Sequence, residues 1–417
     1  MTTKTFKGNF TQQEPIPEVA IERAVAVLRS GRLHRYNVAE GEISETALLE
    51  TEFSAYMGGA HCLAVTSGGY AMVTALRAFG VAAGEPVLTN AFTLSPVPGA
   101  IHAAGCKSVL VEVTAELVID LEDLQRKIKS SKSRVLLLSH MRGHLADMDA
   151  LMRIANAHGV AVIEDCAHTM GASWRDTKSG LHGIAACYST QTYKHINSGE
   201  GGFLISRDAE LMARATILSG SYMLYDRRGA GPEASVYVDI RLDTPNCSGR
   251  MDNLRAAILR PQLALLDANR ERWNARYRAM EDALRNVPGV RLPERPAEES
   301  YVASSFQFLA RDLGKNGILD LLRRCKARGV ELKWFGADEP VAYTSRHDSW
   351  RYIEPQALPQ TDRVLSELLD MRLPLTFSVE DCQLIGEIIR DCVFEAREAV
   401  RTGEAAKSAK SFVLEAS

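Results

Sequence analysis

Short apolar, β-branched runs alternate with amphipathic stretches between about residues 60 and 206. Runs of this length predict buried strands, and the longer stretches between them predict helices. This strand–helix–strand order predicts an α/β domain with a mostly parallel central sheet and helices on both faces. The expected strands are 62–66, 86–90, 108–113, 134–140, 160–165, 186–192 and 202–206, and the expected helices between them are 70–79, 121–129 and 148–158.

The second half of the chain predicts a different arrangement. A helix is expected after residue 208, then a glycine-, proline- and charge-rich loop over 225–245, then a long helical region over 251–285. The remaining pattern predicts a smaller α+β domain, with strands near 290–292 and 305–309 and helices over 318–328 and 379–398. We therefore expect a large domain over 1–250, a long helix and small domain over 251–403, and a flexible tail over 404–417.

Composition narrows the class of protein. A net charge of −3 with interspersed signs gives no attraction to nucleic acid or to an anionic membrane surface. The eight cysteines form no CxxC pair, which is typical of a reducing compartment. The first fifteen residues lack an apolar signal core, and no apolar run reaches the roughly 18 residues of a membrane span. We expect a soluble cytoplasmic protein without nucleic-acid or membrane partners.

Parallel sheets bind ligands at the carboxyl ends of their strands, so residues that follow the expected strands are the candidates for chemistry. Glu164 and Asp165 end the fifth expected strand after four apolar residues. A carboxylate buried there is costly unless a cation faces it, and a protonated pyridine nitrogen is such a cation. A helix cap or a hydrogen-bonded structural acid is the alternative interpretation.

Lys194 follows a hydroxyl-rich segment, 188–193, and precedes the glycine-rich run 199–202. Desolvation or nearby positive charge lowers the pKa of such a lysine, and its neutral amine can then form a Schiff base. By itself, a lysine at this position is more often a surface charge.

Two further strand ends carry weaker signals. Ser67, Gly68 and Gly69 stand at a strand-to-helix junction, where exposed backbone amides can bind a phosphate, although a tight turn explains them equally well. Phe92 follows the second expected strand and could stack on a planar ring, although a lone aromatic is more often core.

Taken in this order, these segments resemble the fold-type I pyridoxal-phosphate enzymes, and within them the DegT/StrS-type sugar aminotransferases. The resemblance covers about residues 20–270, with a weaker match at 371–375 and a specific one in the Gly199–Gly202 run. It implies pyridoxal 5'-phosphate as the cofactor and a role for each of eight residues. By resemblance, the Schiff-base lysine is Lys194, the partner of the pyridine nitrogen is Asp165, the residue beside the phenolic oxygen is His168, the stacked aromatic is Phe92, and the phosphate cradle is Ser67, Gly68, Gly69 and Ser189.

Two details refine the resemblance. Related sugar 3-dehydratases carry histidine at the lysine position, whereas here Lys194 is present and His195 merely follows it, which favours transamination. The family's Asn-Tyr-Arg-Met, which reaches the cofactor phosphate from the neighbouring subunit, is Ser-Gly-Arg-Met at 248–251. That contact would therefore fall to Ser248 or to Asn246.

We expect an aminotransferase that moves an amino group from glutamate or glutamine to a keto-sugar or similar small ketone, in the biosynthesis of an amino sugar or secondary metabolite. The resemblance also implies a homodimer with the active site near the subunit interface. The alternatives are another pyridoxal-phosphate reaction, such as elimination or dehydration, and a non-catalytic regulatory member.

Arg227 and Arg228 could grip an anionic substrate group or lie in a solvated loop.

Overall fold

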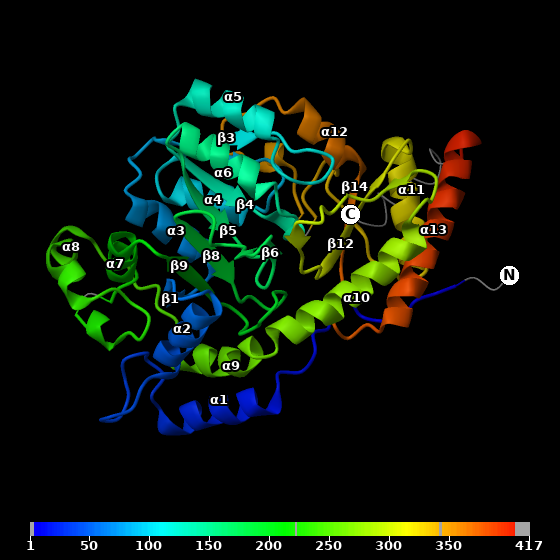
Figure 1. Cartoon of the computed structure of the whole chain (residues 1–417). Helices are drawn as coiled ribbons and strands as arrows, with labels where there is room; N and C mark the ends of the chain where they lie inside the picture. The colour runs from blue at the N-terminus through cyan, green and yellow to red at the C-terminus, as the bar shows by residue number, and fades with distance from the viewer. Residues whose placement is uncertain (1–3, 222, 342–343, 405–417) are drawn as a thin grey trace.

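The computed structural model of the protein describes residues 4–221, 223–341 and 344–404 (Figure 1). Its large domain is built on a seven-stranded sheet with the order β1-β9-β8-β5-β4-β2-β3, in which β9 runs antiparallel to both of its neighbours. The remaining paired strands are parallel, which confirms the predicted sheet. The strands are β1 (His61–Val65), β2 (Pro86–Asn90), β3 (Lys107–Val111), β4 (Val135–Ser139), β5 (Ala161–Asp165), β8 (Ala185–Ser189) and β9 (Gly202–Ser206).

Helices cover both faces of this sheet because its strands are apolar on both sides. Val135 and Leu137 of β4 pack with α3 (Gly68–Phe79), α4 (Pro96–Ala103) and α7 (Ala209–Leu218). The alternate residues, Leu136 and Leu138, pack with α5 (Leu121–Ser131) and α6 (Met148–Ala157) on the other face. Alternation with a period of two therefore places one strand in two hydrophobic clusters.

The small domain has a four-stranded sheet with the order β10-β12-β14-β13, covered by helices at the right of Figure 1. Phe6 and Phe10, from the start of the chain, pack into the core of this domain. We propose that the boundary between the large and the small domain lies near residue 250. The elements are α10 (Leu266–Leu284), β10 (Val290–Arg291), β12 (Ser305–Ala310), α11 (Gly314–Ala327), β13 (Lys333–Trp334), α12 (Pro359–Glu367), β14 (Leu368–Arg372) and α13 (Val379–Arg401).

Several predicted bounds were wrong. The helical region after residue 250 is two helices, α9 (Asn253–Leu263) and α10, and the expected strand over 186–192 ends at Ser189. The expected loop over 225–245 contains a helix, α8 (Tyr237–Asp243), held by Tyr237 stacked on Tyr225 with ring centroids 4.1 Å apart. The predicted tail lies outside the described residues from 405 onward. Elements without a sequence prediction include α1 (Glu18–Ser30), α2 (Glu45–Tyr56), α4, α12, β13, β14 and a three-stranded sheet of β11 (Glu299–Ser300), β6 (Ser173–Trp174) and β7 (Thr177–Lys178).

Among the described residues, no helix combines the length and the apolar character that crossing a bilayer requires.

Candidate active site

A cavity of about 360 Å³ lies at the carboxyl ends of the central strands. It is closed on one side by the small domain, which contributes Ser304, Ser305, Lys333 and Arg372. Seven of the eight predicted site residues share its wall. They are Ser67, Gly68, Gly69, Asp165, His168, Ser189 and Lys194.

The junction of β1 and α3 has the geometry of an anion site. Ser67 caps α3, since its Oγ accepts a hydrogen bond from the amide of Tyr70 at 3.0 Å. A Cβ built on Gly69 would meet only Ser67 Oγ, at 3.9 Å, so the start of the helix is open toward the cavity. A Cβ on Gly68 would approach the Cβ of Ser189 to 3.0 Å, which brings the end of β8 against the same turn. Backbone amides and one hydroxyl thus converge where a phosphate fits.

Gly202 allows the backbones around this turn to approach each other. It pairs with Val65 and with Ser189 in the sheet. A Cβ there would lie 2.5 Å from the carbonyl oxygen of Tyr188 and 2.7 Å from the amide of Gly68.

We expect Gly202→Ala to lower the free energy of unfolding by about 1–3 kcal/mol, because the start of α3 must move to relieve overpacking. Denaturant titration measures the loss. The matched control is Gly99→Ala in α4, where a Cβ meets nothing closer than 3.9 Å and should be neutral or stabilising. Equal stability of the two variants would contradict the packing argument.

Asp165 ends β5 as a buried carboxylate, with 6% of its surface exposed. The Ser139 hydroxyl donates to its Oδ2 at 2.9 Å, and the Ala167 amide donates to its Oδ1 at 3.2 Å. Burial raises its pKa. No ion pair reaches it from the described residues, so this cavity-lining carboxylate is suited to a cationic ligand group.

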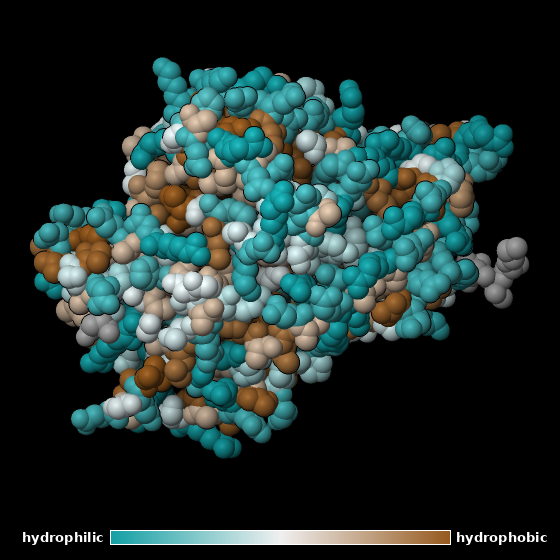
Figure 2. Space-filling view, in the orientation of Figure 1, coloured by the Kyte–Doolittle hydropathy of each residue, from teal (hydrophilic) through white to brown (hydrophobic). Residues whose placement is uncertain are grey.

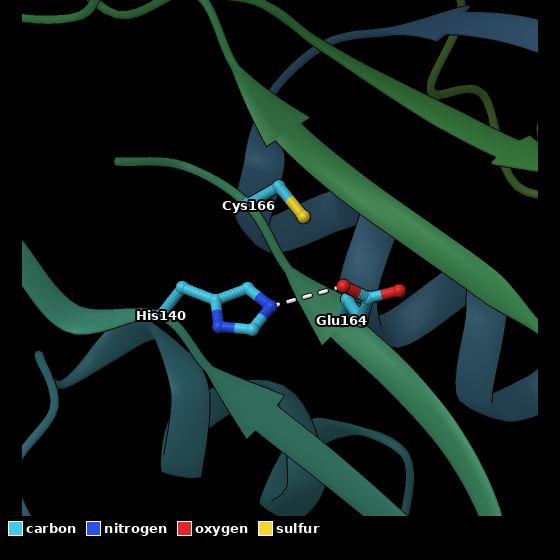
Figure 3. Close-up of side chains that lie close together, drawn as sticks. All are labelled: His140, Glu164 and Cys166. Carbon is cyan, nitrogen blue, oxygen red and sulfur yellow. Dashed lines mark hydrogen bonds and ion pairs between the residues drawn. The ribbon is translucent and has the colours of Figure 1, made fainter. Parts of the chain in front are cut away.

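The neighbouring Glu164 has a structural role. Figure 3 shows its carboxylate beside His140 and Cys166, and the Glu164–His140 distance is 3.0 Å. Both carboxylate oxygens also accept backbone N–H bonds of 2.8–2.9 Å from the 180–183 turn. Burial raises the pKa of the Cys166 thiol, which disfavours the thiolate that a metal would need. The carboxylate oxygens therefore serve to hold the 180–183 turn.

Lys194 lies on the cavity wall with its Nζ 3.0 Å from His168 Nε2. Burial, helped by the smaller effects of Arg142 and Arg372, lowers the pKa of Lys194 to about 7 against the opposing effect of Asp165. Burial and the nearby Lys194 also lower the pKa of His168, which keeps the imidazole neutral. The pair therefore supplies a reactive amine beside a neutral hydrogen-bonding ring.

The lowered pKa predicts that, in cofactor-free protein, Lys194 is acylated half-maximally near pH 7. The amine is protonated and unreactive below that pH and nucleophilic above it, whereas an ordinary lysine changes near pH 10.4. Competitive acetylation followed by peptide mass spectrometry measures the midpoint, with the surface lysines as internal controls. A midpoint for Lys194 that coincides with those of the surface lysines would contradict the prediction.

A model of the DegT/DnrJ/EryC1/StrS aminotransferase family matches residues 16–390. The chain belongs to this family. Its fold is the fold-type I architecture of pyridoxal-phosphate enzymes, and pyridoxal phosphate is the family's cofactor, as predicted. The open start of α3, the buried carboxylate of Asp165 and the Lys194 amine with its lowered pKa have the chemistry that this cofactor requires.

Individual relatives agree with this assignment. The chain is 32% identical over 256 residues to the Saccharopolyspora erythraea protein named erythromycin biosynthesis sensory transduction protein EryC1, a match that spans 60% of this chain and 65% of that protein. It is 29% identical over 300 residues to the L-glutamine:2-deoxy-scyllo-inosose aminotransferase of Streptomyces fradiae, over 71% of this chain and 70% of that enzyme. The crystal structure of S. venezuelae DesV superposes with a TM-score of 0.75 at 27% identity, covering 90% of this chain and 94% of DesV. The predicted aminotransferase class is confirmed.

In this aminotransferase, Phe92 is not on the cavity wall. Its side chain is 1% exposed and packs edge-on against Phe335 of the small domain, with ring centroids 5.0 Å apart. The sequence prediction correctly placed the residue after β2 but did not identify this apolar partner. A stacking role for Phe92 remains a prediction that this packing does not favour.

Arg228 is likewise not available to grip a substrate. It is 7% exposed and forms an ion pair with Glu50, which also pairs with Arg35 at 2.8 Å. Ser248 accepts a hydrogen bond from Arg250 at 3.2 Å. Ser248 and Asn246 lie outside the cavity wall of the described chain.

His195, which follows Lys194, does not line the cavity of the described chain. It is 4% exposed, and its Nε2 lies 3.1 Å from the hydroxyl of Ser304. Sequence reasoning missed Arg142, Lys333 and Arg372, which also line the cavity. The only sequence signal for any of them is the weak family match over 371–375, which contains Arg372.

Proposed function

We propose that this enzyme transfers an amino group from L-glutamine or L-glutamate to a ketone on a sugar or a related ring, in the biosynthesis of an amino sugar or secondary metabolite. The observation that carries the proposal is the Lys194 amine, with a pKa of about 7, in one cavity with the buried carboxylate of Asp165. The name of the S. fradiae relative supports glutamine as the donor and a ring ketone as the acceptor.

Pyridoxal phosphate, when bound, supplies an electron-withdrawing ring that stabilises negative charge on the amino-acid carbon. In our assignment, Asp165 keeps the ring nitrogen protonated, and Ser139 orients that carboxylate through its 2.9 Å hydrogen bond. The amides at the start of α3 and the hydroxyl of Ser189 hold the phosphate. Lys194 would be the residue that holds the cofactor covalently when no substrate is bound.

Lys194 also serves as the proton carrier in this proposal. An amine whose pKa lies near 7 can both accept and return a proton at neutral pH, which is the requirement for moving it between the donor carbon and the cofactor. The neutral His168 imidazole, 3.0 Å away, holds the amine in place without competing for the proton.

Amino transfer is tested directly by incubating the cofactor-loaded enzyme with L-glutamine and a panel of keto-sugars and keto-cyclitols. We expect an aminated product whose nitrogen derives from labelled glutamine, detected by mass spectrometry. Ammonia release without an aminated product would instead support elimination. Absence of both, together with specific binding of an unchanged ligand, would favour the regulatory alternative.

We also propose that the enzyme is a cytoplasmic homodimer with its active site near the subunit interface. Exposed apolar side chains support a second subunit, and Figure 2 shows hydrophobic surface over α8 and around α1. The exposed apolar side chains include Val19, Leu28, Ile43, Met223, Val238 and Leu242. Sedimentation equilibrium should give twice the chain mass of 45.8 kDa, and a monomer at micromolar concentration would refute the dimer.

A further inference from the structure

The small-domain sheet has one apolar face and one polar face. Phe306, Phe308 and Met371 point into the small-domain core. The alternate residues of these strands therefore lie on the opposite face. There, Ser305 of β12 pairs with Arg372 of β14, and Lys333 of β13 pairs with Asp370 of β14.

The η1 turn (Met141–Gly143), which follows β4 in the large domain, lies against this polar face. Arg142 donates to the carboxylate of Asp370 at 2.7 Å, and His144 lies 3.0 Å from Gln307. Arg142 adopts a left-handed backbone conformation, with φ of 57°, which is unfavourable for residues other than glycine. The ion pair with Asp370 offsets this strain and fixes the guanidinium at the cavity.

Three cations thus meet on one wall of the cavity: Arg142, Lys333 and Arg372. Arg372 lies over the ring of Tyr193, 3.5 Å from its centroid, which orients the guanidinium. Among the described residues, neither Arg372 nor Lys333 has a side-chain hydrogen bond or an ion pair. Of the carboxylates in the described chain, Asp370 is therefore the only one that pairs directly with one of these three cations.

One donor atom in this cluster is buried without a partner. Arg142 is 9% exposed, and its Nε has no hydrogen-bond acceptor in the described chain. Leaving such a donor unpaired is costly, so its position on a cavity wall indicates an acceptor supplied by a ligand.

We propose that Arg142, Lys333 and Arg372 form a carboxylate-binding subsite for a substrate of the amino transfer. The inference rests on the proposed function, because it takes the cavity to be the place of reaction. Arginine forks recognise carboxylates through paired hydrogen bonds, and lysine adds a point charge. The carboxylate belongs either to the amino-acid donor or to an acidic group on the keto acceptor.

The test uses Arg372→Met and Lys333→Met, separately and together, in the cofactor-loaded enzyme. Calorimetric titration with 2-oxoglutarate should show binding to the unmodified enzyme and about tenfold or greater weakening in each single variant. The uncharged dimethyl ester should bind equally to all forms. Arg311→Met, an exposed arginine of the same domain, is the matched control and should leave the affinity unchanged.

Single-turnover measurements then identify the source of the carboxylate. A raised half-saturation concentration for L-glutamine in the variants assigns the subsite to the donor, and a rise confined to the keto substrate assigns it to the acceptor. Either result supports the subsite. Unchanged affinity for 2-oxoglutarate, or loss of pyridoxal phosphate from the variants, would overturn it. Calorimetry needs no turnover, so failure of amino transfer alone would refute the proposed function and leave the subsite standing.

Discussion

Lys194→Ala is expected to abolish turnover, lowering the rate by about 10⁴-fold or more, because one side chain serves both as the covalent anchor and as the proton carrier. Reduction with borohydride followed by peptide mass spectrometry should find pyridoxal phosphate attached at residue 194 in the unmodified enzyme and at no residue in the variant. The cavity retains its other lining groups, so non-covalent cofactor binding should persist.

The matched control is Lys178→Met. Burial also lowers the pKa of Lys178, but its ammonium lies over the ring of Tyr56, outside the cavity. That variant should keep its activity and its covalent cofactor. Substantial turnover by Lys194→Ala would end the assignment of this residue.

Asp165→Asn is expected to lower turnover by at least about 10²-fold with little loss of stability, because it removes a preorganised charge opposite the cofactor ring. Asparagine can still accept the hydrogen bond from the Ala167 amide through its Oδ1, and its side-chain N–H can donate to the Ser139 hydroxyl oxygen, so the shape of the site is kept. Steady-state kinetics and thermal unfolding, measured on the same preparation, separate the two effects.

The adjacent Glu164→Gln should behave in the opposite way. Its carboxylate pairs with His140 and receives three backbone N–H bonds, so the amide would leave buried donors unsatisfied. We expect a loss of about 3 kcal/mol in the free energy of unfolding, with the folded fraction still active. If the two substitutions have the same profile, the division into a catalytic and a structural carboxylate is wrong.

Site residues at the carboxyl ends of strands in one sheet could be predicted from the sequence. Site residues that meet across the two domains could not. Asp165, Ser189 and the Ser67–Gly69 turn each follow a parallel strand of one sheet, and parallel strands bring their carboxyl ends together. Hydrophobic periodicity identifies those strands, and the family resemblance then assigns their roles.

Periodicity gives no information on contacts between the sheets of the two domains. Arg142 and Asp370 are 228 residues apart in the chain and meet only because the small sheet turns its polar face to η1. The packing of Phe92 against Phe335 was missed for the same reason. The helix α8 was missed because seven residues are too few to give a helical pattern within a charged segment.

The η1 turn has a consequence for recombining this enzyme with its relatives. Specificity is often exchanged by grafting the C-terminal part of one homologue onto another. Here the Arg142–Asp370 and His144–Gln307 contacts cross any such junction. A graft that imports β12 and β14 alone would leave a strained arginine and a buried aspartate without their partners. Residues 141–144 must therefore be transferred with the incoming segment.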